Sequence, residues 1–202
     1  MSVRVRFAPS PTGPLHIGGV RTALYNYLFA KKNKGVFVLR IEDTDQERYV
    51  EGAEDYIINA LKWLGIDPDE GPNTEKEHGP YRQSERKDLY IKYIDDVLSS
   101  ENAYIAFDTH DELQALRKEA ESHGETFIYN WNNREELRNS LTLSKKECES
   151  LVKNKTPYVV RFKTHALGEE ENISLLDAVR GEITVNKSLL DDKILVKQDG
   201  MP

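Results

Sequence analysis

The N-terminal third of the chain alternates between two hydrophobic patterns. Segment 3–7 alternates apolar residues with arginines, which predicts a strand, and segment 18–32 has the apolar spacing of a helix. Segment 35–41 is a β-rich run of the buried-strand type, and 50–64 is again amphipathic with helical spacing. A strand–helix–strand–helix order with helix-sized connections predicts an α/β fold with a parallel sheet and right-handed crossovers.

The later part of the chain has a different order of predicted elements, which predicts an inserted α+β region rather than more of the parallel sheet. A loop is predicted over 66–86 and a helix over 85–99. Further helix starts are indicated by the capping boxes Thr109-x-x-Glu112 and Ser144-x-x-Glu147, and by Asn133-x-x-Glu136, which resembles one. Strands are predicted at 158–163, 182–185 and 193–197.

Polar segments follow both predicted N-terminal strands. Ligand sites in parallel sheets lie beyond the carboxyl ends of the strands. Residues 6–19 follow the first strand and the acidic turn 42–45 follows the second. We therefore expect these two segments to converge at one edge of the sheet.

The first of these segments has the features of an anion-binding site. Gly18 and Gly19 open the predicted helix, whose N-terminus offers free N–H donors and a partial positive charge. His16 adds a side-chain donor, although a histidine in this position can instead serve as a helix cap. The glycine spacing matches neither a P-loop nor a dinucleotide-binding fingerprint.

The distribution of charge also points to an anion site near the N-terminus. The chain of 202 residues has a formal net charge of −7, yet residues 1–41 contain seven basic and no acidic side chains. Such asymmetry indicates anion handling by that segment, with a cluster of solvated lysines as the alternative.

Composition limits the class of protein further. An apolar fraction of 38% suits a globular domain, and no run approaches the ~20 apolar residues of a membrane span. The single cysteine, Cys148, excludes a disulfide framework and a cysteine-based zinc cage. These features predict a cytoplasmic protein that is not bound to a membrane.

Several blocks of the sequence resemble one family. Segment 6–24, RFAPSPTGPLHIGGVRTAL, is similar to the "HIGH" signature of class I aminoacyl-tRNA synthetases in its bacterial glutamyl-tRNA synthetase form. Further similar blocks are LRIEDTDQERYVEGAEDYI (39–57), LKWLGIDPDEGP (61–72), GPYRQSERKDLY (79–90), YVVRFK (158–163) and RGEITVNKSLLDDKILVKQDGMP (180–202). The resemblance covers essentially the whole chain, more weakly over 101–156, and Gly19 replaces the last histidine of the signature.

This resemblance implies a fold and a reaction. The fold would be a Rossmann-like parallel sheet, with residues 1–85 as the first half of the catalytic domain. Residues 86–202 would be an inserted region that binds the tRNA acceptor end and returns toward the catalytic domain near the C-terminus. In the reaction, glutamate and ATP form glutamyl-adenylate, and the glutamyl group then passes to the 3′ end of tRNA(Glu).

The resemblance also implies roles for individual residues. The catalytic group would be His16, Gly18 and Gly19. Glutamate would be bound by Arg6, Ala8, Ser10 and Glu42. ATP would be bound by Pro9, Thr12, Gly13, His16, Gly18 and Gly19. A fixed arginine suits the substrate carboxylate, because arginine can only donate and matches a carboxylate bidentately; the alternative for Arg6 is a solvated strand residue.

The remaining expectations concern cofactors, partners and extent. Mg²⁺ is expected with ATP, whereas zinc is not, because the stretch 103–107 lacks the cysteines that some relatives carry there. A monomer is expected. A K-M-S-K-type loop is missing from the sequence and nothing resembles an anticodon-binding domain, so a fragment without activity of its own is expected. Alternatives are a paralogue acting on queuosine-modified tRNA, a glutamine-specific relative and a non-catalytic RNA- or substrate-binding module.

Overall fold

The computed structural model describes residues 3–45, 48–74, 76–164 and 172–201. The chain forms two compact units, Met1–Tyr90 and Ile91–Pro202, and the division falls within helix α3 (Lys87–Ser99). Within the described ranges, no helix combines the length and the apolar character that crossing a bilayer requires.

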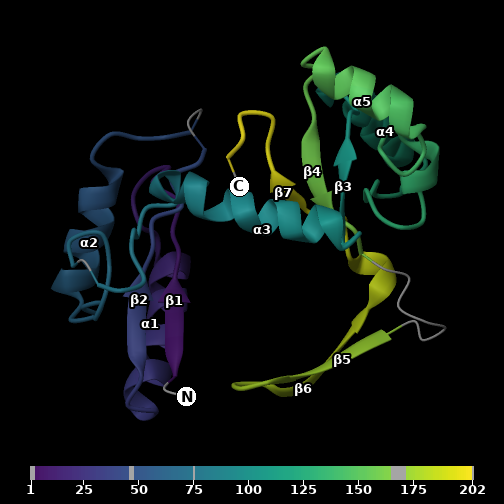
Figure 1. Ribbon diagram of the computed structural model, residues 1–202. Helices are drawn as coiled ribbons and strands as arrows, with labels where there is room; N and C mark the ends of the chain where they lie inside the picture. The colour runs from purple at the N-terminus through teal and green to yellow at the C-terminus, as the bar shows by residue number, and fades with distance from the viewer. Residues whose placement is uncertain (1–2, 46–47, 75, 165–171, 202) are drawn as a thin grey trace. The chain divides into compact units, whose positions relative to one another are not determined.

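The first unit has the predicted strand–helix–strand–helix order: β1 (Arg4–Phe7), α1 (Ile17–Lys32), β2 (Val36–Leu39) and α2 (Ala53–Trp63) (Figure 1). Strands β1 and β2 pair in parallel, with Arg4 opposite Val36 and Phe7 opposite Leu39. The parallel pairing is therefore confirmed. Helix α2 begins later than predicted, because the backbone of Gly52 adopts a φ of +79° immediately before it.

Both helices pack on one face of the β1–β2 pair. The core consists of side chains from the two strands, α1, α2 and the residues that follow them: Phe7, Ala23, Ala30, Phe37, Leu39, Ile41, Ile57, Leu61 and Ile66. Strand side chains alternate between faces, so Arg4 and Arg6 lie on the face opposite Phe7. The core thus fixes which side of β1 carries the arginines.

The predicted loop 66–86 adds extended backbone along β2. Val38 and Ile41 form isolated parallel bridges with Glu70 and Arg82. The amide of Leu39 donates to the Glu70 carbonyl at 2.8 Å, and the Gln83 amide donates to the Ile41 carbonyl at 2.9 Å. A 3₁₀ turn, Ser84–Arg86, then leads into α3. This loop therefore supplies residues next to the arginine face.

The second unit contains an antiparallel sheet in the order β3 (Ala103–Ala106), β4 (Val159–Phe162), β7 (Ile194–Val196). Helices α4 (His110–Ser122) and α5 (Lys145–Lys153) lie beside β3 and β4 (Figure 1). Strands β5 (Asn172–Asp177) and β6 (Gly181–Asn186) form a separate hairpin, and 3₁₀ turns cover Arg134–Glu136 and Lys187–Leu189. The predicted strands at 158–163, 182–185 and 193–197 are confirmed, whereas β3 and β5 were not predicted.

Two of the three capping sequences behave as predicted. Thr109 and Ser144 form reciprocal capping boxes with Glu112 and Glu147. At Asn133 the predicted helical start is present as the 3₁₀ turn Arg134–Glu136, but the capping bond is not: the Asn133 side chain accepts from the Asn130 amide at 3.0 Å and donates to the Ile128 carbonyl at 2.7 Å. These loop contacts use the side-chain oxygen that a cap would need.

A buried carboxylate holds the second unit together. Asp192 is fully buried and accepts from the Tyr104 hydroxyl at 2.6 Å, the Thr164 amide at 2.9 Å and Arg134 Nη1 at 3.2 Å. It also accepts from the Thr164 hydroxyl. Burial and the hydrogen bond to Asp192 raise the pKa of Tyr104. The Asp192 carboxylate is therefore already committed to these neighbours.

Candidate functional site

The segments that follow β1 and β2 lie against each other. The Glu42 amide donates to the Pro9 carbonyl at 2.9 Å, and the Val50 amide donates to the Pro11 carbonyl at 3.0 Å. Within the first segment the Thr12 amide donates to the Ser10 carbonyl at 2.9 Å. The predicted convergence at the carboxyl edge of the parallel strands is confirmed.

His16 is the N-cap of α1. Its Nδ1 accepts from the Gly18 amide at 3.1 Å, so a neutral ring carries its proton on Nε2, which can donate outward. A Cβ on Gly18 would lie 2.8 Å from His16 Cε1, so glycine is needed for this ring position. In the part of the chain that the structure describes, the Ile17 and Gly19 amides have no hydrogen-bond partner. His16 can therefore cap the helix through Nδ1 and still offer Nε2 to an anion, so the two roles expected for it are compatible.

On the arginine face, Arg4 is tied to a buried carboxylate. Its Nη1 and Nη2 donate to the two oxygens of Glu70 at 2.7 Å each, and the Tyr81 hydroxyl donates to Glu70 Oε2 at 2.7 Å. The bonds from Arg4 hold the pKa of the Glu70 carboxyl at about 2. Burial raises the pKa of Tyr81 to about 12. Arg4, Glu70 and Tyr81 thus form a hydrogen-bonded cluster.

Arg4 and Tyr81 of this cluster also line a cavity of about 250 Å³, and most of its lining residues are basic. Its lining residues are Arg4, Val5, Arg6, Val38, Arg40, His78, Tyr81 and Arg86. Arg86 donates to the Pro80 carbonyl at 2.7 Å, and Arg40 donates to Glu42 at 2.7 and 3.0 Å. The side chain of Arg6, in contrast, is exposed and makes no hydrogen bond or ion pair with any described residue. Among the four guanidinium groups of the lining, Arg4 and Arg40 have carboxylate partners, Arg86 is bonded to neutral oxygens, and Arg6 has neither kind of partner among the described residues.

The other residues assigned to glutamate do not line this cavity. Ala8 and Ser10 lie in the loop after β1. The Glu42 carboxylate accepts a hydrogen bond from Arg40, which is a lining residue of the cavity. Both bonds from Arg40 end on Glu42 Oε1, which leaves Oε2 without a hydrogen bond among the described residues. Arg6 and Arg40 both line the cavity, whereas Glu42 lies outside its lining and is joined to it by the ion pair with Arg40.

The acidic turn after Glu42 is engaged in local structure. Asp43 accepts from the Ser84 amide at 2.8 Å, and Asp45 accepts from Arg48 Nε at 2.7 Å. Among the described residues, no group of three or more His, Cys, Asp or Glu side chains is placed to hold a metal ion. The carboxylates of Asp43 and Asp45 thus brace the turn.

Arg40, His78 and Arg86 were missed in the sequence as site residues. Arg40 could have been found, because it lies within the second predicted strand, 35–41, two positions after Val38 and therefore on the same face. His78 and Arg86 come from the predicted loop and from the start of the next helix, and no pattern connects them to the first strand. Their place at the cavity depends on the path of residues 78–86 beside β2.

Comparison with known proteins gives consistent matches. A family model described as "tRNA synthetases class I (E and Q), catalytic domain" matches residues 2–202. The chain is 62% identical over 200 residues to a protein of Christiangramia forsetii and 59% identical to one of Flavobacterium johnsoniae, both named "Glutamate--tRNA ligase". Each match covers 99% of this chain and 39% of the relative.

Solved structures agree with the sequence matches. A crystal structure of a glutamate tRNA ligase from Elizabethkingia meningosepticum in complex with its amino acid superposes with a TM-score of 0.89 at 55% identity. That of the Elizabethkingia anophelis glutamate-tRNA synthetase superposes with a TM-score of 0.90, also at 55% identity. Each superposition covers 100% of this chain and 40% of the solved one. The predicted Rossmann-like α/β class is confirmed, and the chain spans about two fifths of the length of these relatives.

Proposed function

The chain belongs to the class I tRNA synthetases of the E and Q group, and on this basis we propose that it carries substrate-binding elements for the ligation of L-glutamate to tRNA(Glu). The reaction would use ATP and proceed through glutamyl-adenylate. The names of the close relatives support glutamate as the amino acid. The Elizabethkingia relative crystallised with its amino acid supports a site within this fold.

The side chain of Arg6 is the main observation behind the proposal that the site binds glutamate. It is the guanidinium of the basic cavity without a hydrogen bond or ion pair among the described residues. A glutamate side chain would supply the missing carboxylate, and a cavity of about 250 Å³ suits a small ligand. Glutamine would leave the charge unpaired, at a cost of about 2–5 kcal/mol.

Glu42 is proposed to hold the ammonium group of the substrate. Its Oε2 accepts no hydrogen bond from the described residues, while Arg40 fixes the carboxylate through Oε1. Ala8 and Ser10 would line the path between Glu42 and Arg6, because they lie in the loop whose Pro9 carbonyl is bonded to Glu42. This arrangement would place the α-carboxylate near the start of α1.

The start of α1 is proposed to bind the phosphates of ATP. The unbonded Ile17 and Gly19 amides and the outward Nε2 of His16 are donors suited to phosphate oxygens. Pro9, Thr12 and Gly13 would complete the loop around the nucleotide; Gly13 has a φ of +149°, which favours glycine. Catalysis would come from positioning the carboxylate for in-line attack and from stabilising charge on the phosphate.

Mg²⁺ is proposed to arrive with ATP as part of the substrate. The carboxylates of the acidic turn are bonded to Ser84, Arg48 and Arg40, so they form no ready-made ligand set for the ion. The second unit, within the predicted region 86–202, is proposed to contact the acceptor end of tRNA(Glu).

The test replaces Arg6 in the full-length protein and follows glutamate-dependent ATP–pyrophosphate exchange in the presence of tRNA. Arg6→Ala should lower kcat/KM for glutamate at least about tenfold. The control Lys62→Ala removes an exposed cation of α2 in the first unit, outside the cavity lining, and should leave kcat/KM unchanged. Unchanged kcat/KM in Arg6→Ala would reject the assignment, and tRNA binding without any exchange would favour the binding-module alternative.

A further inference from the structure

The acidic turn after β2 is held by a residue 41 positions later in the chain. The Asp43 carboxylate accepts from the Ser84 amide at 2.8 Å through one oxygen and from the Ser84 hydroxyl through the other. Two backbone bonds precede this contact: the Ile41 amide donates to the Tyr81 carbonyl, and the Gln83 amide donates to the Ile41 carbonyl, each at 2.9 Å. Asp43 thus continues with its side chain the pairing that Ile41 makes with its backbone.

Groups of the proposed amino-acid site lie on both sides of this contact. Glu42, the proposed ligand of the substrate ammonium, directly precedes Asp43. Arg86, which lines the basic cavity, follows Ser84 by two residues, and Tyr81 of the same lining precedes it by three. The contact therefore joins the segment of the ammonium ligand to the segment that supplies part of the cavity lining.

The side chain of Arg86 is placed by residues next to Ser84. Its Nη1 donates to the Pro80 carbonyl at 2.7 Å, and its Nε donates to the Tyr90 hydroxyl at 3.1 Å. The Tyr90 hydroxyl in turn donates to the side-chain oxygen of Gln83 at 3.2 Å, and Gln83 is buried. Because Gln83 is the neighbour of Ser84, a shift of Ser84 would also displace the Arg86 guanidinium.

The contact depends on the shape of the Asp43 side chain more than on its charge. Ser84 offers two neutral donors, and its hydroxyl can also accept a hydrogen bond. An asparagine at position 43 can therefore accept from the Ser84 amide with its oxygen and donate to the Ser84 hydroxyl with its nitrogen. Alanine would lose both bonds. This difference separates a positioning role of Asp43 from an electrostatic one.

We propose that Asp43 is a positioning residue for the amino-acid substrate. Through Ser84 it fixes the Glu42 carboxylate relative to the segment that lines the basic cavity. The inference rests on the proposed function, because glutamate is the substrate whose binding it concerns. Loss of the contact would weaken the binding of glutamate, since small displacements of positioned groups are costly, and would leave the binding of ATP nearly unchanged.

The experiment measures ATP–pyrophosphate exchange by the full-length protein in the presence of tRNA, at varied glutamate and at varied ATP. Asp43→Ala should raise the KM for glutamate about tenfold and change the KM for ATP less than about twofold. Asp43→Asn should keep the KM for glutamate within about threefold of wild type, because asparagine can make both bonds to Ser84. Loss of structure alone would lower the amount of active enzyme, and hence kcat, without changing either KM.

A second variant keeps the test independent of the folding of Asp43→Ala. Ser84→Ala removes only the hydroxyl bond and should raise the KM for glutamate about threefold. Combined with Asp43→Ala it should add less than about twofold, because the two residues act through the same contact. The matched control is Glu85→Ala, which removes the next side chain of the same 3₁₀ turn. Glu85 is exposed and bonded to Arg82 at 3.2 Å, so its loss should change the KM for glutamate less than about twofold.

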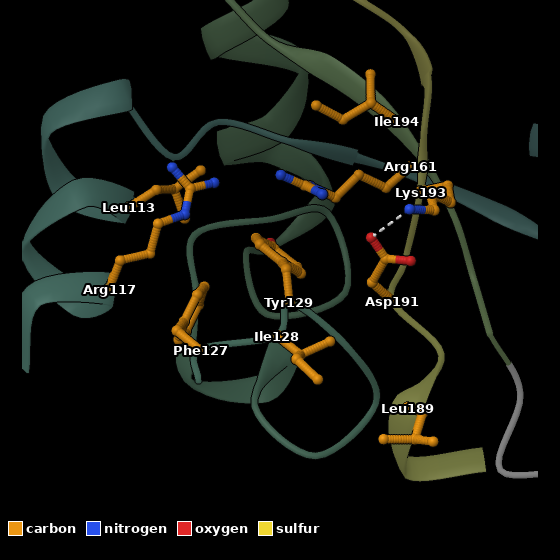
Figure 2. Close-up of a pocket in the computed structure, with 10 residues that line it drawn as sticks. All are labelled: Leu113, Arg117, Phe127, Ile128, Tyr129, Arg161, Leu189, Asp191, Lys193 and Ile194. Carbon is orange, nitrogen blue, oxygen red and sulfur yellow. Dashed lines mark ion pairs between the residues drawn. The ribbon is translucent and has the colours of Figure 1, made fainter. Parts of the chain in front are cut away.

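Hydrogen exchange gives a readout that needs no substrate. Asp43→Ala should speed exchange of the Ser84 amide at least about tenfold, because this amide loses its acceptor. The reference is segment 127–131 of the second unit, where the guanidinium carbon of Arg161 lies 3.8 Å from the centre of the Tyr129 ring (Figure 2). This segment should exchange as in the wild-type protein, which would show that the effect is local.

A raised KM for glutamate in Asp43→Ala that Asp43→Asn restores would support the proposal. Lowered kcat with both KM values unchanged, equal impairment of Asp43→Asn and Asp43→Ala, or equal effects of Ser84→Ala and Glu85→Ala would overturn it. If segment 127–131 also exchanges faster in Asp43→Ala, Ser84→Ala decides: a raised KM for glutamate supports the proposal and an unchanged one overturns it.

Failure of the positioning role is distinguishable from failure of the proposed function. Unchanged kcat/KM in Arg6→Ala would reject the assignment of the glutamate site itself. Impaired Arg6→Ala beside an unaffected Asp43→Ala would keep that assignment and reject the positioning role alone.

Discussion

Two arginines of one short strand have opposite environments. Arg4 makes two bonds of 2.7 Å to Glu70, while Arg6, two residues further along the same face, has no described partner. The pair favours the charged carboxylate although Glu70 is 95% buried, because the bidentate bonds from Arg4 and the bond from the Tyr81 hydroxyl satisfy both oxygens. The charge of Arg6 remains available to a ligand.

The Glu70 cluster predicts a fall in stability at acid pH. The pKa of Glu70 is lowered from 4.5 to about 2 in the folded protein. A depressed pKa stabilises the fold above the unfolded pKa, and this stabilisation is lost as the pH falls toward 2. Glu70 alone should therefore lower the free energy of unfolding by about 2 kcal/mol between pH 6 and pH 3.

Urea denaturation at the two pH values measures this effect. Other carboxylates also titrate, so the informative quantity is the difference between the wild-type protein and Glu70→Gln. The variant should be less stable at pH 6 and should lose about 2 kcal/mol less on acidification. Glu121→Gln, at an exposed position of α4, serves as the control with the wild-type pH profile. An identical pH dependence in Glu70→Gln would refute the assignment.

A substitution of His16 can separate its observed capping role from its proposed catalytic role. Asparagine is a good N-cap, so His16→Asn should keep the stability of α1 but lose the donor at Nε2. We expect kcat for pyrophosphate exchange in the full-length protein to fall about 10²–10³-fold. The KM for ATP should change less than about threefold, because the lost interaction forms mainly in the transition state. A raised KM with unchanged kcat would instead assign His16 to ground-state binding.

Sequence patterns predicted the placement of Arg6 but not the identity of its neighbours. Alternation in segment 3–7 places Arg4 and Arg6 on one face, and that face is observed. The alternation cannot tell the environments of Arg4 and Arg6 apart, because Glu70, the partner of Arg4, lies 66 residues away in the sequence. His16 was predictable because its cap contact is local, two residues away. Short-range contacts follow from the sequence, whereas pairing across the fold depends on the chain path.

At the scale of elements, the connection from α1 to β2 is closely packed. A Cβ on Gly35 would lie 2.3 Å from the carbonyl oxygen of Val3 and 2.9 Å from its Cβ. The next amide, of Val36, donates to that same carbonyl at 2.8 Å. Because the contact is with backbone, it can be relieved only by moving β1 away from β2.

Gly35→Ala should therefore lower the free energy of unfolding by at least about 2 kcal/mol. Urea denaturation followed by circular dichroism measures the change. The control Lys32→Ala, at an exposed position in the last turn of α1, should change stability by less than about 0.5 kcal/mol. If Gly35→Ala unfolded at the wild-type urea concentration, the close approach of the two strands would be wrong.

Elements were predictable where the pattern is long or the start signal is local. Helix α1 and the capped helices α4 and α5 have such signals. Strand β3 has four residues, of which three are buried, so it lacks the alternation that marks a strand with one exposed face. The pairing of residues 70 and 82 with β2 was not predictable, because two prolines and two glycines in that segment signal a loop.

At the scale of the whole molecule, the N-terminal excess of positive charge is partly compensated in the fold. Arg4, Lys31 and Arg40 form ion pairs with Glu70, Asp69 and Glu42, all later in the sequence. The charge asymmetry of residues 1–41 therefore overstates the positive charge that is left for a ligand. The net charge of −7 makes the rest of the surface unfavourable for phosphate groups.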